Sequence, residues 1–257
     1  MSAPALRVTN ITKRFGGLAA ISDVTYEVLD GSLTALIGPN GAGKTTLFNL
    51  ITNLFTPTEG EIYFYGKSLN GLSPRQIAGL GLIRTFQTAR VFPGMTVLEN
   101  VLVGAHRRVR SHTLKQMLWQ ASARHEEREL TARADGFLEI TNLLKFRDVA
   151  ATDLPMGGQK LLEVIRALMT RPRLLLLDEP AAGLNDSETS ELASLLRAVR
   201  NSGVTVMVVE HNMSLVMGVA DQVMVLDAGC LVASGSPQEI RKNARVIEAY
   251  VGQEAAV

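Results

Sequence analysis

Three short stretches of the chain are almost continuously apolar and end in polar or glycine-rich sequence. They are LTALIG at 33–38, LLLLDEP at 174–180 and VTVMVVEH at 204–211. Apolar runs of this length, bounded by turn residues, are typical of strands that are buried on both faces of a parallel sheet. We therefore expect a central parallel sheet, in which the carboxyl ends of these strands meet at one edge.

The remaining pattern predicts strands near the N-terminus and helices after them. Three segments rich in β-branched and aromatic residues are bounded by glycine or asparagine, at 6–15, 22–28 and 60–69. Between about 96 and 145 the chain is highly charged and poor in glycine and proline, which favours helix. A terminal helix is predicted at 236–252, beginning at Ser236 or Pro237. The pattern indicates an α/β fold with a helical insertion.

Composition narrows the class of protein. With 257 residues, 46% of them hydrophobic, the chain is long enough for one large domain or two small ones. Lysine plus arginine (26) nearly balance aspartate plus glutamate (25), so a nucleic-acid partner is not expected. Cys230 is the only cysteine, no secretory signal is visible, and no apolar run approaches the ~18 residues of a membrane span. These features predict a soluble, cytoplasmic protein.

Residues 38–46, GPNGAGKTT, match the pattern of a phosphate-binding loop and directly follow a predicted strand. Glycines allow backbone N–H groups to wrap around phosphate oxygens, and the start of the following helix favours negative charge. Lys44 would reach the β- and γ-phosphates, and the Thr45 hydroxyl would hold Mg²⁺. The expected ATP-binding residues of this loop are Gly38, Pro39, Asn40, Gly41, Ala42, Gly43, Lys44, Thr45 and Thr46.

Asp178 and Glu179 place two carboxylates at the end of the second apolar run. Asp178 would bind in the Mg²⁺ shell, and Glu179 would polarise an attacking water molecule. A pair of acidic residues is by itself a weak signal, because many strands end in carboxylates. Together with a phosphate loop at the same edge of a parallel sheet, the pair predicts a site of nucleotide hydrolysis.

A second glycine-rich stretch, LPMGGQK at 154–160, begins a sequence with helical spacing, which is typical of anion binding. With the phosphate loop and LLLLDEP, it resembles the ATPase subunit of ATP-binding-cassette (ABC) transporters over essentially the whole chain. The resemblance implies a P-loop NTPase (RecA-like) core with a parallel central sheet and an N-terminal antiparallel β subdomain. It also implies a helical subdomain at about 88–165, inserted in one nucleotide-binding domain at 1–257.

The resemblance assigns roles to three residues that are unremarkable when taken singly. Phe15 resembles the aromatic residue that stacks on adenine, Gln87 the glutamine that contacts Mg²⁺ or water, and His211 the histidine that contacts the γ-phosphate. Each has a plainer interpretation, as a packing side chain, a surface amide and a strand-end histidine. Their order and context favour the functional roles. The expected catalytic residues are Lys44, Glu179 and His211, and the expected metal ligands are Thr45, Gln87 and Asp178.

In this family two ATPase subunits pair head to tail, with each ATP between the phosphate loop of one and the signature loop of the other. The resemblance makes 154–159 the signature loop, and its residues are Leu154, Pro155, Met156, Gly157, Gly158 and Gln159. The usual form is Leu-Ser-Gly-Gly-Gln, so Pro155 removes a hydroxyl and an N–H, although proline suits the first position of a helix. Asn185 likewise stands where the family usually has aspartate.

The segments 84–104, 178–185 and 210–229 together resemble the ATPases of high-affinity branched-chain amino-acid importers, in particular the longer of their two ATPase subunits. The resemblance implies ATP and Mg²⁺ as cofactors and a position on the cytoplasmic face of the cell membrane. It implies as partners a second ATPase subunit, identical or different, integral membrane permease subunits and, indirectly, a periplasmic or extracellular solute-binding protein. An importer of urea or another small solute is the alternative within this group.

Val91, Phe92 and Met95 follow Gln87 and would supply an apolar docking groove for the permease, with internal packing as the alternative. Two other classes of function compete. A non-transport ABC ATPase of DNA repair or translation usually carries a long coiled coil or a second cassette, and this chain has neither. A small-molecule kinase would leave the signature loop, Gln87 and His211 unexplained.

Overall fold

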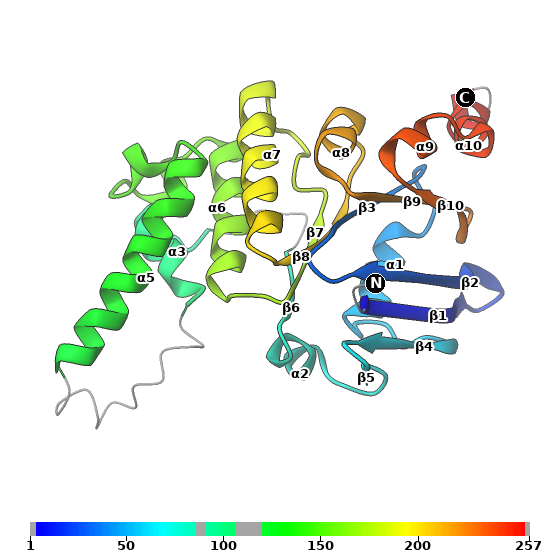
Figure 1. The fold of residues 1–257 in the computed structure, drawn as a ribbon, viewed down its shortest axis with the longest axis horizontal. Helices are drawn as coiled ribbons and strands as arrows, with labels where there is room; N and C mark the ends of the chain where they lie inside the picture. The colour runs from blue at the N-terminus through cyan, green and yellow to red at the C-terminus, as the bar shows by residue number, and fades with distance from the viewer. Residues whose placement is uncertain (1–3, 86–90, 106–119, 255–257) are drawn as a thin grey trace. The chain divides into compact units, whose positions relative to one another are not determined.

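The computed structural model describes residues 4–85, 91–105 and 120–254 of the chain (Figure 1). The chain forms two compact units. The first comprises 1–84, 173–179 and 196–257, and the second comprises 85–172 and 180–195. Each unit is therefore assembled from segments that are far apart in the sequence.

The first unit contains a six-stranded sheet in the order β10-β9-β3-β8-β7-β6. Its strands are β3 (Leu33–Ile37), β6 (Leu82–Arg84), β7 (Leu174–Asp178), β8 (Thr205–Val209), β9 (Gln222–Asp227) and β10 (Cys230–Gly235). Neighbouring strands are parallel except for β9 and β10, which pair antiparallel at one edge. Every residue of β3, β7 and β8 is buried, so the prediction that the three apolar runs form a central parallel sheet is confirmed.

A second, antiparallel sheet of the first unit has the order β2-β1-β4-β5. Its strands are β1 (Pro4–Phe15), β2 (Leu18–Leu29), β4 (Glu59–Phe64) and β5 (Lys67–Ser68). Buried and exposed residues alternate in the second half of β2, as they do in a strand with one face on a core. The expected antiparallel N-terminal sheet is therefore present.

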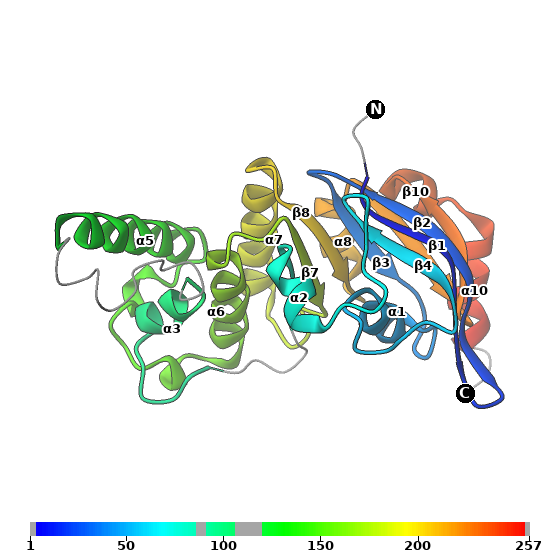
Figure 2. The same cartoon turned by 90° about the horizontal axis from the view of Figure 1, so that it is seen from below.

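A shared hydrophobic core joins the helix α1 (Lys44–Ile51) to both sheets. Leu47, Phe48 and Ile51 of α1 are fully buried in one cluster with residues of β1, β4 and β7. Figures 1 and 2 both show α1 beside the sheets. Burying each of these side chains contributes roughly 1.5–3 kcal/mol. The packing holds the start of α1, and the loop before it, at the carboxyl edge of the parallel sheet.

Four further helices of the first unit are short. They are α2 (Pro74–Gly79), α8 (Met213–Val219), α9 (Pro237–Arg241) and α10 (Ala244–Glu254). Ser236 caps α9 and Pro237 is its first residue, as predicted. The prediction of one continuous helix at 236–252 is wrong, because Asn243 interrupts it. The side chain of Asn243 accepts a hydrogen bond from the N–H of Arg245 (3.0 Å), which favours a new helix start over helix continuation.

The second unit contains the helices α3 (Val97–Val103), α5 (Gln120–Ile140) and α6 (Met156–Met169), and α7 (Asp186–Asn201) begins in it. Helix α3 begins with a capping box formed by Thr96 and Glu99. At Gly104, just after α3, a Cβ atom would lie 2.0 Å from the backbone oxygen of Arg166 in α6. Glycine therefore permits α3 and α6 to pack backbone against backbone. Within the described residues, the charged segment is helical as predicted.

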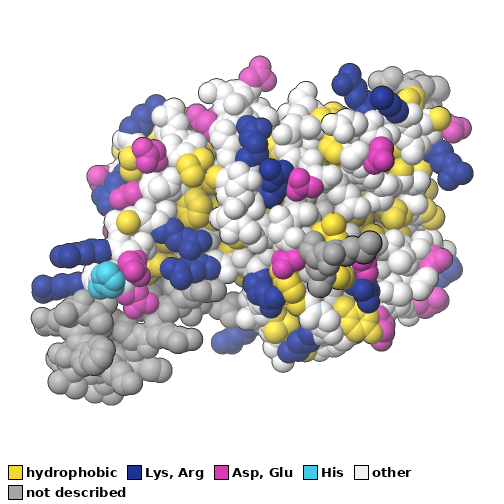
Figure 3. Space-filling model, viewed as in Figure 1, with side chains coloured by type: hydrophobic (Ala, Val, Ile, Leu, Met, Phe, Trp, Pro, Cys, Tyr) yellow, Lys and Arg dark blue, Asp and Glu magenta, His cyan; other side chains and the backbone are white. Residues whose placement is uncertain are grey.

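The distribution of charged side chains on the surface agrees with the nearly equal numbers of acidic and basic residues in the sequence. Figure 3 shows acidic and basic side chains interspersed over the visible face, with small hydrophobic areas between them. Among the residues that the structure describes, no helix has both the length and the apolar character needed to cross a membrane.

Candidate nucleotide-binding and hydrolysis site

The phosphate loop connects β3 to α1, and its three glycines, Gly38, Gly41 and Gly43, all have positive φ, a backbone conformation that other residues rarely take. Gly38 has φ 150°, and a Cβ atom there would lie 2.0 Å from the backbone oxygen of Leu226. Gly43 caps α1 with φ 100°, and its Cβ would lie 2.7 Å from the backbone oxygen of Ala20. These contacts explain why glycine stands at both ends of the loop. The first turn of α1 contains no acidic residue that would repel a phosphate group.

Lys44 is folded into this loop. Its Nζ donates hydrogen bonds to the backbone oxygens of Gly38 (2.7 Å) and Pro39 (2.8 Å), and the residue is 6% exposed. Burial lowers the pKa of the Lys44 ammonium group, and the negative charges of Glu179 and Asp178 oppose that shift. The Lys44 ammonium group thus lies within the loop and close enough to Glu179 and Asp178 for their charges to act on it.

Asp178, the last residue of β7, is 3% exposed and uses its two oxygens differently. Oδ2 accepts a hydrogen bond from Nη2 of Arg84 (2.7 Å). Oδ1 is buried and has no hydrogen-bond partner among the described residues. A buried acceptor without a partner is costly unless a ligand satisfies it.

Asp178 and Thr45 have the donor chemistry that Mg²⁺ requires. No group of three or more His, Cys, Asp or Glu side chains in the described parts of the chain would bind a metal ion unaided. Mg²⁺ in nucleotide sites is usually held by one or two protein oxygens together with substrate phosphates and water. The free Oδ1 of Asp178 and the exposed Thr45, the second residue of α1, fit such a site. Gln87, the third expected ligand, lies outside the described residues.

Glu179 and His211 meet at the same edge of the sheet. His211 Nε2 lies 3.0 Å from Glu179 Oε1. In the parallel pairing of β7 with β8, Asp178 lies opposite Val209, so the residues that follow the two strands lie next to each other. Glu179 has φ 49°, an unfavourable conformation for a non-glycine residue, and its N–H donates to the backbone oxygen of Val209 (2.9 Å). Strained backbone of this kind is concentrated at functional sites.

Glu210 was not anticipated as part of this arrangement. It is 2% exposed, and its Oε2 accepts hydrogen bonds from the N–H groups of His211 (3.0 Å) and Asn212 (3.2 Å). The buried carboxylate orients the backbone that carries His211. The sequence feature that could have identified Glu210 is an acidic residue at the end of an otherwise apolar run. A carboxylate that is buried there must be hydrogen-bonded, and it therefore has a structural role.

Phe15 ends β1, and it is 44% exposed. The ring of Phe55 packs against it edge-on, with centroids 5.3 Å apart and an interplanar angle of 79°. Lys13 Nζ lies 5.0 Å from the centroid of Phe15. Phe55 therefore supports the ring of Phe15, a contact that the sequence did not indicate. An exposed, supported aromatic ring is suited to stacking on a base.

The signature loop lies in the second unit, at the start of α6. Pro155 is the N-cap and Met156 the first helical residue, so proline occupies the position before the one expected for it. Pro155 makes no side-chain capping hydrogen bond to this end of α6 in the part of the chain that the structure describes. Gly157 and Gly158 are buried, whereas Met156 is 72% exposed. An uncapped helix start with compact glycines is suited to an anionic ligand.

Two side chains of α6 stabilise the loops around its start. Gln159 turns back, and its Nε2 donates to the backbone oxygen of Leu154 (2.9 Å). Lys160 Nζ donates to the backbone oxygen of Ala182, which lies in the stretch AGLN that ends at Asn185. These contacts join the signature loop to the 182–185 loop within the second unit.

The residues expected to dock onto the permease belong to a loop whose backbone is hydrogen-bonded to a buried side chain. Phe92 (43%) and Met95 (38%) are exposed, and Val91 is half-buried. Asn100, fully buried, donates through Nδ2 to the backbone oxygens of Phe92 (3.2 Å) and Met95 (3.3 Å). The buried amide shapes the loop while its apolar side chains remain accessible.

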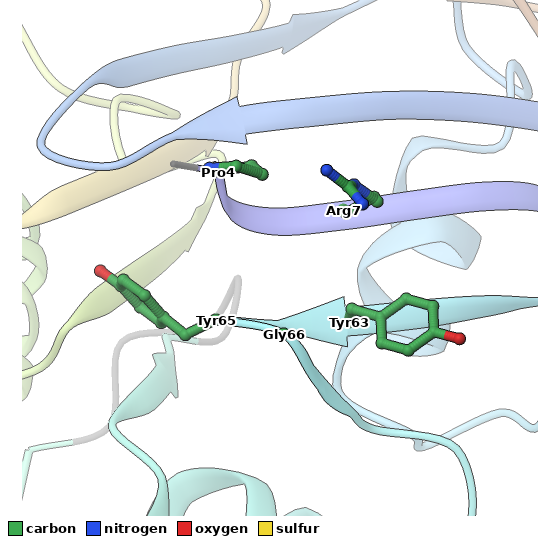
Figure 4. A pocket seen from close by; sticks show the side chains of 5 residues that line it. All are labelled: Pro4, Arg7, Tyr63, Tyr65 and Gly66. Atoms are coloured by element: carbon green, nitrogen blue, oxygen red, sulfur yellow. The ribbon is translucent and has the colours of Figure 1, made fainter. Parts of the chain in front are cut away.

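A pocket of about 460 Å³ lies elsewhere, over β1 and β4 of the antiparallel sheet (Figure 4). Its lining residues are Pro4, Arg7, Tyr63, Tyr65 and Gly66. None of them belongs to the phosphate loop, to the ends of β7 and β8 or to the signature loop, so this pocket is separate from the candidate site.

Comparison with known proteins identifies the family. The family model described as "ABC transporter" matches residues 21–182. The chain belongs to the ABC transporter family. A model described as "Branched-chain amino acid ATP-binding cassette transporter" also matches residues 230–256. The family expected from the phosphate loop, LLLLDEP and the signature loop is confirmed, and with it the P-loop NTPase fold.

Relatives of this ABC transporter chain match it along nearly its whole length. It is 44% identical over 254 residues to the high-affinity branched-chain amino acid transport ATP-binding protein BraF of Pseudomonas aeruginosa, covering 98% of this chain and 100% of that protein. It is 43% identical, with the same coverage, to LivG of Escherichia coli, which bears the same description. The crystal structure of the ADP conformation of MJ1267, an ATP-binding cassette of an ABC transporter, matches with a TM-score of 0.81 and 31% identity, covering 98% and 100% of the two chains.

Proposed function

We propose that this chain is the ATP-binding and ATP-hydrolysing motor subunit of an ABC importer, acting as one nucleotide-binding domain. The observation that carries the proposal is the arrangement at the carboxyl edge of the parallel sheet. The phosphate loop follows β3, Asp178 is the last residue of β7 with Glu179 directly after it, and His211 lies just beyond the end of β8. One edge therefore combines groups for binding phosphate, for holding a cation and for activating water.

In nucleotide binding, the loop amides and Lys44 would hold the phosphates of ATP, and Phe15 would stack on the adenine. Lys44 would exchange its hydrogen bonds with Gly38 and Pro39 for bonds with phosphate oxygens. Thr45 and Asp178, together with Gln87, would hold Mg²⁺, which would offset the negative charge of the phosphates.

In hydrolysis, Glu179 would accept a hydrogen bond from the attacking water and so increase the nucleophilicity of the water. His211, 3.0 Å from Glu179, would orient that carboxylate and contact the γ-phosphate. The hydrogen bonds that the Glu210 carboxylate accepts from the backbone N–H groups of residues 211 and 212 would keep the histidine in place. Pre-positioned groups of this kind lower the barrier without reorganising during the reaction.

We propose that two such subunits, identical or different, enclose ATP between them, with residues 154–159 of one facing the ATP of the other. The uncapped start of α6 supports this role. A solved relative also supports it, since the ATP-binding cassette MJ0796, 25% identical with a TM-score of 0.74 over 90% of this chain, is described as dimeric. ATP that contacts both subunits would bind the closed pair more tightly than the separate subunits and would thereby stabilise that pair by mass action.

We propose that the exposed Phe92 and Met95, with Val91, dock onto membrane permease subunits at the cytoplasmic face of the membrane. BraF and LivG are named for high-affinity branched-chain amino acid transport, so the proposed solutes are leucine, isoleucine and valine. An extracellular or periplasmic solute-binding protein would deliver them. This chain would contact the permease and not the solute.

The test is transport by the assembled system in liposomes, with leucine and urea offered separately. We expect ATP-driven leucine uptake that is lost in Glu179→Gln. Uptake of urea alone would overturn the solute class, and ATP hydrolysis without any membrane partner or transport would overturn the transport role. For docking, Phe92→Glu should abolish co-purification with the permease, whereas Ile247→Glu, the same change at another exposed apolar residue in α10, should not.

A further inference from the structure

Arg84 ends β6 and is a buried cation beside the candidate site. Its register partner in β7 is Leu176, which precedes Asp178 by two residues on the same face of the sheet. The side chain of Arg84 is 8% exposed, and that of Asp178 is 2% exposed. Their 2.7 Å contact is therefore an ion pair shielded from water, in which Arg84 supplies the opposite charge that a buried carboxylate needs.

The same guanidinium also binds helix α1. Arg84 Nη1 donates to Asn49 Oδ1 (2.6 Å) and lies 3.4 Å from Thr52 Oγ1. Its central carbon is 5.6 Å from the centroid of the Phe48 ring, within the range of a cation–π contact. The guanidinium is planar, so its two terminal nitrogens hold Asp178 and Asn49 in a fixed relation to each other.

This bridge connects the two elements that would hold the metal ion. Asn49 follows Thr45 by four residues in α1, so the two side chains lie on the same face of the helix, one turn apart. Arg84 thereby links the helix of Thr45 to the strand of Asp178. It occupies only Oδ2 of Asp178 and leaves Oδ1 without a partner among the described residues.

We propose that Arg84 is a positioning residue for the metal site, a role that rests on the proposed function of Thr45 and Asp178. Arg84 sets the orientation of the Asp178 carboxylate, directs Oδ1 toward the metal position and fixes the distance between Asp178 and α1. Partners that orient metal ligands in this way typically contribute 10–100-fold to metal affinity. A residue that only neutralised buried charge would influence folding but would not change the metal's contribution to nucleotide binding.

The test measures that contribution directly. The dissociation constant of the non-hydrolysable analogue AMP-PNP is determined by calorimetry in EDTA and in Mg²⁺, and the ratio of the two reports metal coupling. Arg84→Lys keeps the charge but has no planar fork, so it binds Asp178 or Asn49 but not both. We expect the ratio to fall by about tenfold in this variant, with affinity in EDTA unchanged.

Asn49→Ala provides an independent variant, because it leaves the ion pair intact and removes the 2.6 Å hydrogen bond that is the shortest of the contacts between Arg84 and α1, while the contacts with Thr52 and Phe48 remain. It should also lower the ratio, although less than Arg84→Lys. Arg7→Lys is the matched control, since Arg7 forms a 2.6 Å ion pair with Glu27 on the exposed antiparallel sheet and should leave the ratio unchanged.

Two results would contradict different parts of the proposal. A wild-type ratio in folded Asn49→Ala, or equal changes of affinity in EDTA and in Mg²⁺, would make Arg84 purely structural and overturn the inference. If Asp178→Asn itself keeps the wild-type ratio, the proposed metal site of Thr45 and Asp178 is wrong. Thermal melting without nucleotide shows separately whether each variant is folded.

Discussion

The carboxylate of Glu188 lies directly against the backbone of Gly157 at the start of α6. A Cβ atom at position 157 would be 2.2 Å from both Cδ and Oε1 of Glu188. Oε2 of the same carboxylate accepts a hydrogen bond from the N–H of Asn185 (3.0 Å). Within one chain, glycine at 157 therefore makes room for a contact between the signature loop and the 182–185 loop, in addition to its proposed role toward the partner's ATP.

Gly157→Ala is predicted to displace the Glu188 carboxylate and to break its hydrogen bond with Asn185. Because Glu188 is a flexible side chain, it can rotate away, so the variant should fold. The loss should be about 0.5–1.5 kcal/mol, the usual net contribution of one hydrogen bond, as measured by urea unfolding of the isolated subunit. Gly157→Asp would add a like charge beside Glu188 and should be more destabilising.

The matched control is the same substitution in a Glu188→Ala background. There the steric conflict is gone, and alanine should be neutral or favoured over glycine by up to about 1 kcal/mol in a helix. Glu188→Ala and Gly157→Ala should thus be non-additive. Independent, additive losses would show that the two residues do not interact in solution.

Asn185 and Glu188 also form a reciprocal cap at the start of α7. Asn185 Oδ1 accepts a hydrogen bond from the N–H of Glu188 (2.9 Å). Asn185→Ala should therefore lower the free energy of unfolding by about 0.5–2 kcal/mol, whereas Asn185→Asp should retain the cap. Ser187→Ala, exposed in the same turn, should show no such loss. Equal stability of Asn185→Ala and the parent in urea would contradict the capping role.

The capping contact explains a departure that looked unfavourable in the sequence. Asn185 replaces the aspartate usual in the family, and from the sequence it only removed a charge. In the structure, the amide accepts a hydrogen bond as well as a carboxylate would, because capping needs only a side-chain oxygen. The local sequence pattern was sufficient to locate Asn185 but did not show that Glu188 is its hydrogen-bond partner.

Local sequence predicted the parts of the site that depend on local rules. The buried runs became β3, β7 and β8, and the loop at 38–46 joins a strand to a helix, because hydrophobic periodicity and glycine geometry act within a few residues. The contact of Arg84 with Asp178 spans 94 residues and depends on β6 lying next to β7. Strand order follows from packing of the whole unit, so this pair, like Phe15 with Phe55, was not predicted.

Lys44→Ala is predicted to weaken ATP binding by about 10–100-fold, because a hydrogen bond to a charged group contributes roughly 1.5–3 kcal/mol. The substitution also removes the bonds from Nζ to Gly38 and Pro39, although glycine conformation and α1 packing should preserve the fold. Titration with a fluorescent ATP analogue measures the affinity. Lys67→Ala, exposed on β5, is the control, and parent affinity in Lys44→Ala would refute the assignment of the loop.

Phe15→Ala should weaken nucleotide binding by about 0.5–1.5 kcal/mol, or up to about tenfold in Kd, through loss of stacking. ATP and GTP should be affected alike, because stacking does not depend on the edges of the base. Phe55→Ala should have a smaller effect, since it removes the edge-on support of the Phe15 ring but leaves that ring in place. Calorimetry that finds the same affinity in Phe15→Ala as in the parent would make Phe15 a packing residue.

Glu179→Gln should abolish turnover while ATP still binds. Glutamine has the same shape, so it retains the backbone conformation at φ 49° and can still contact His211 across 3.0 Å. What it loses is the negative charge that makes an attacking water more nucleophilic. A positioned general base typically contributes 10²–10⁴-fold, so the rate should fall by that factor.

The Glu179→Gln variant should also accumulate an ATP-bound pair of subunits, because binding closes the pair and only hydrolysis reopens it. Light scattering after gel filtration, with the partner subunit and Mg²⁺ present, should detect a dimer with ATP and monomers with ADP. Glu248→Gln, exposed in α10, should turn over ATP at the parent rate and show no such species. Normal turnover in Glu179→Gln would show that the general base is another residue at the carboxyl edge of the parallel sheet. Glu210 is excluded from this role, because its carboxylate is buried and accepts hydrogen bonds from the backbone of residues 211 and 212.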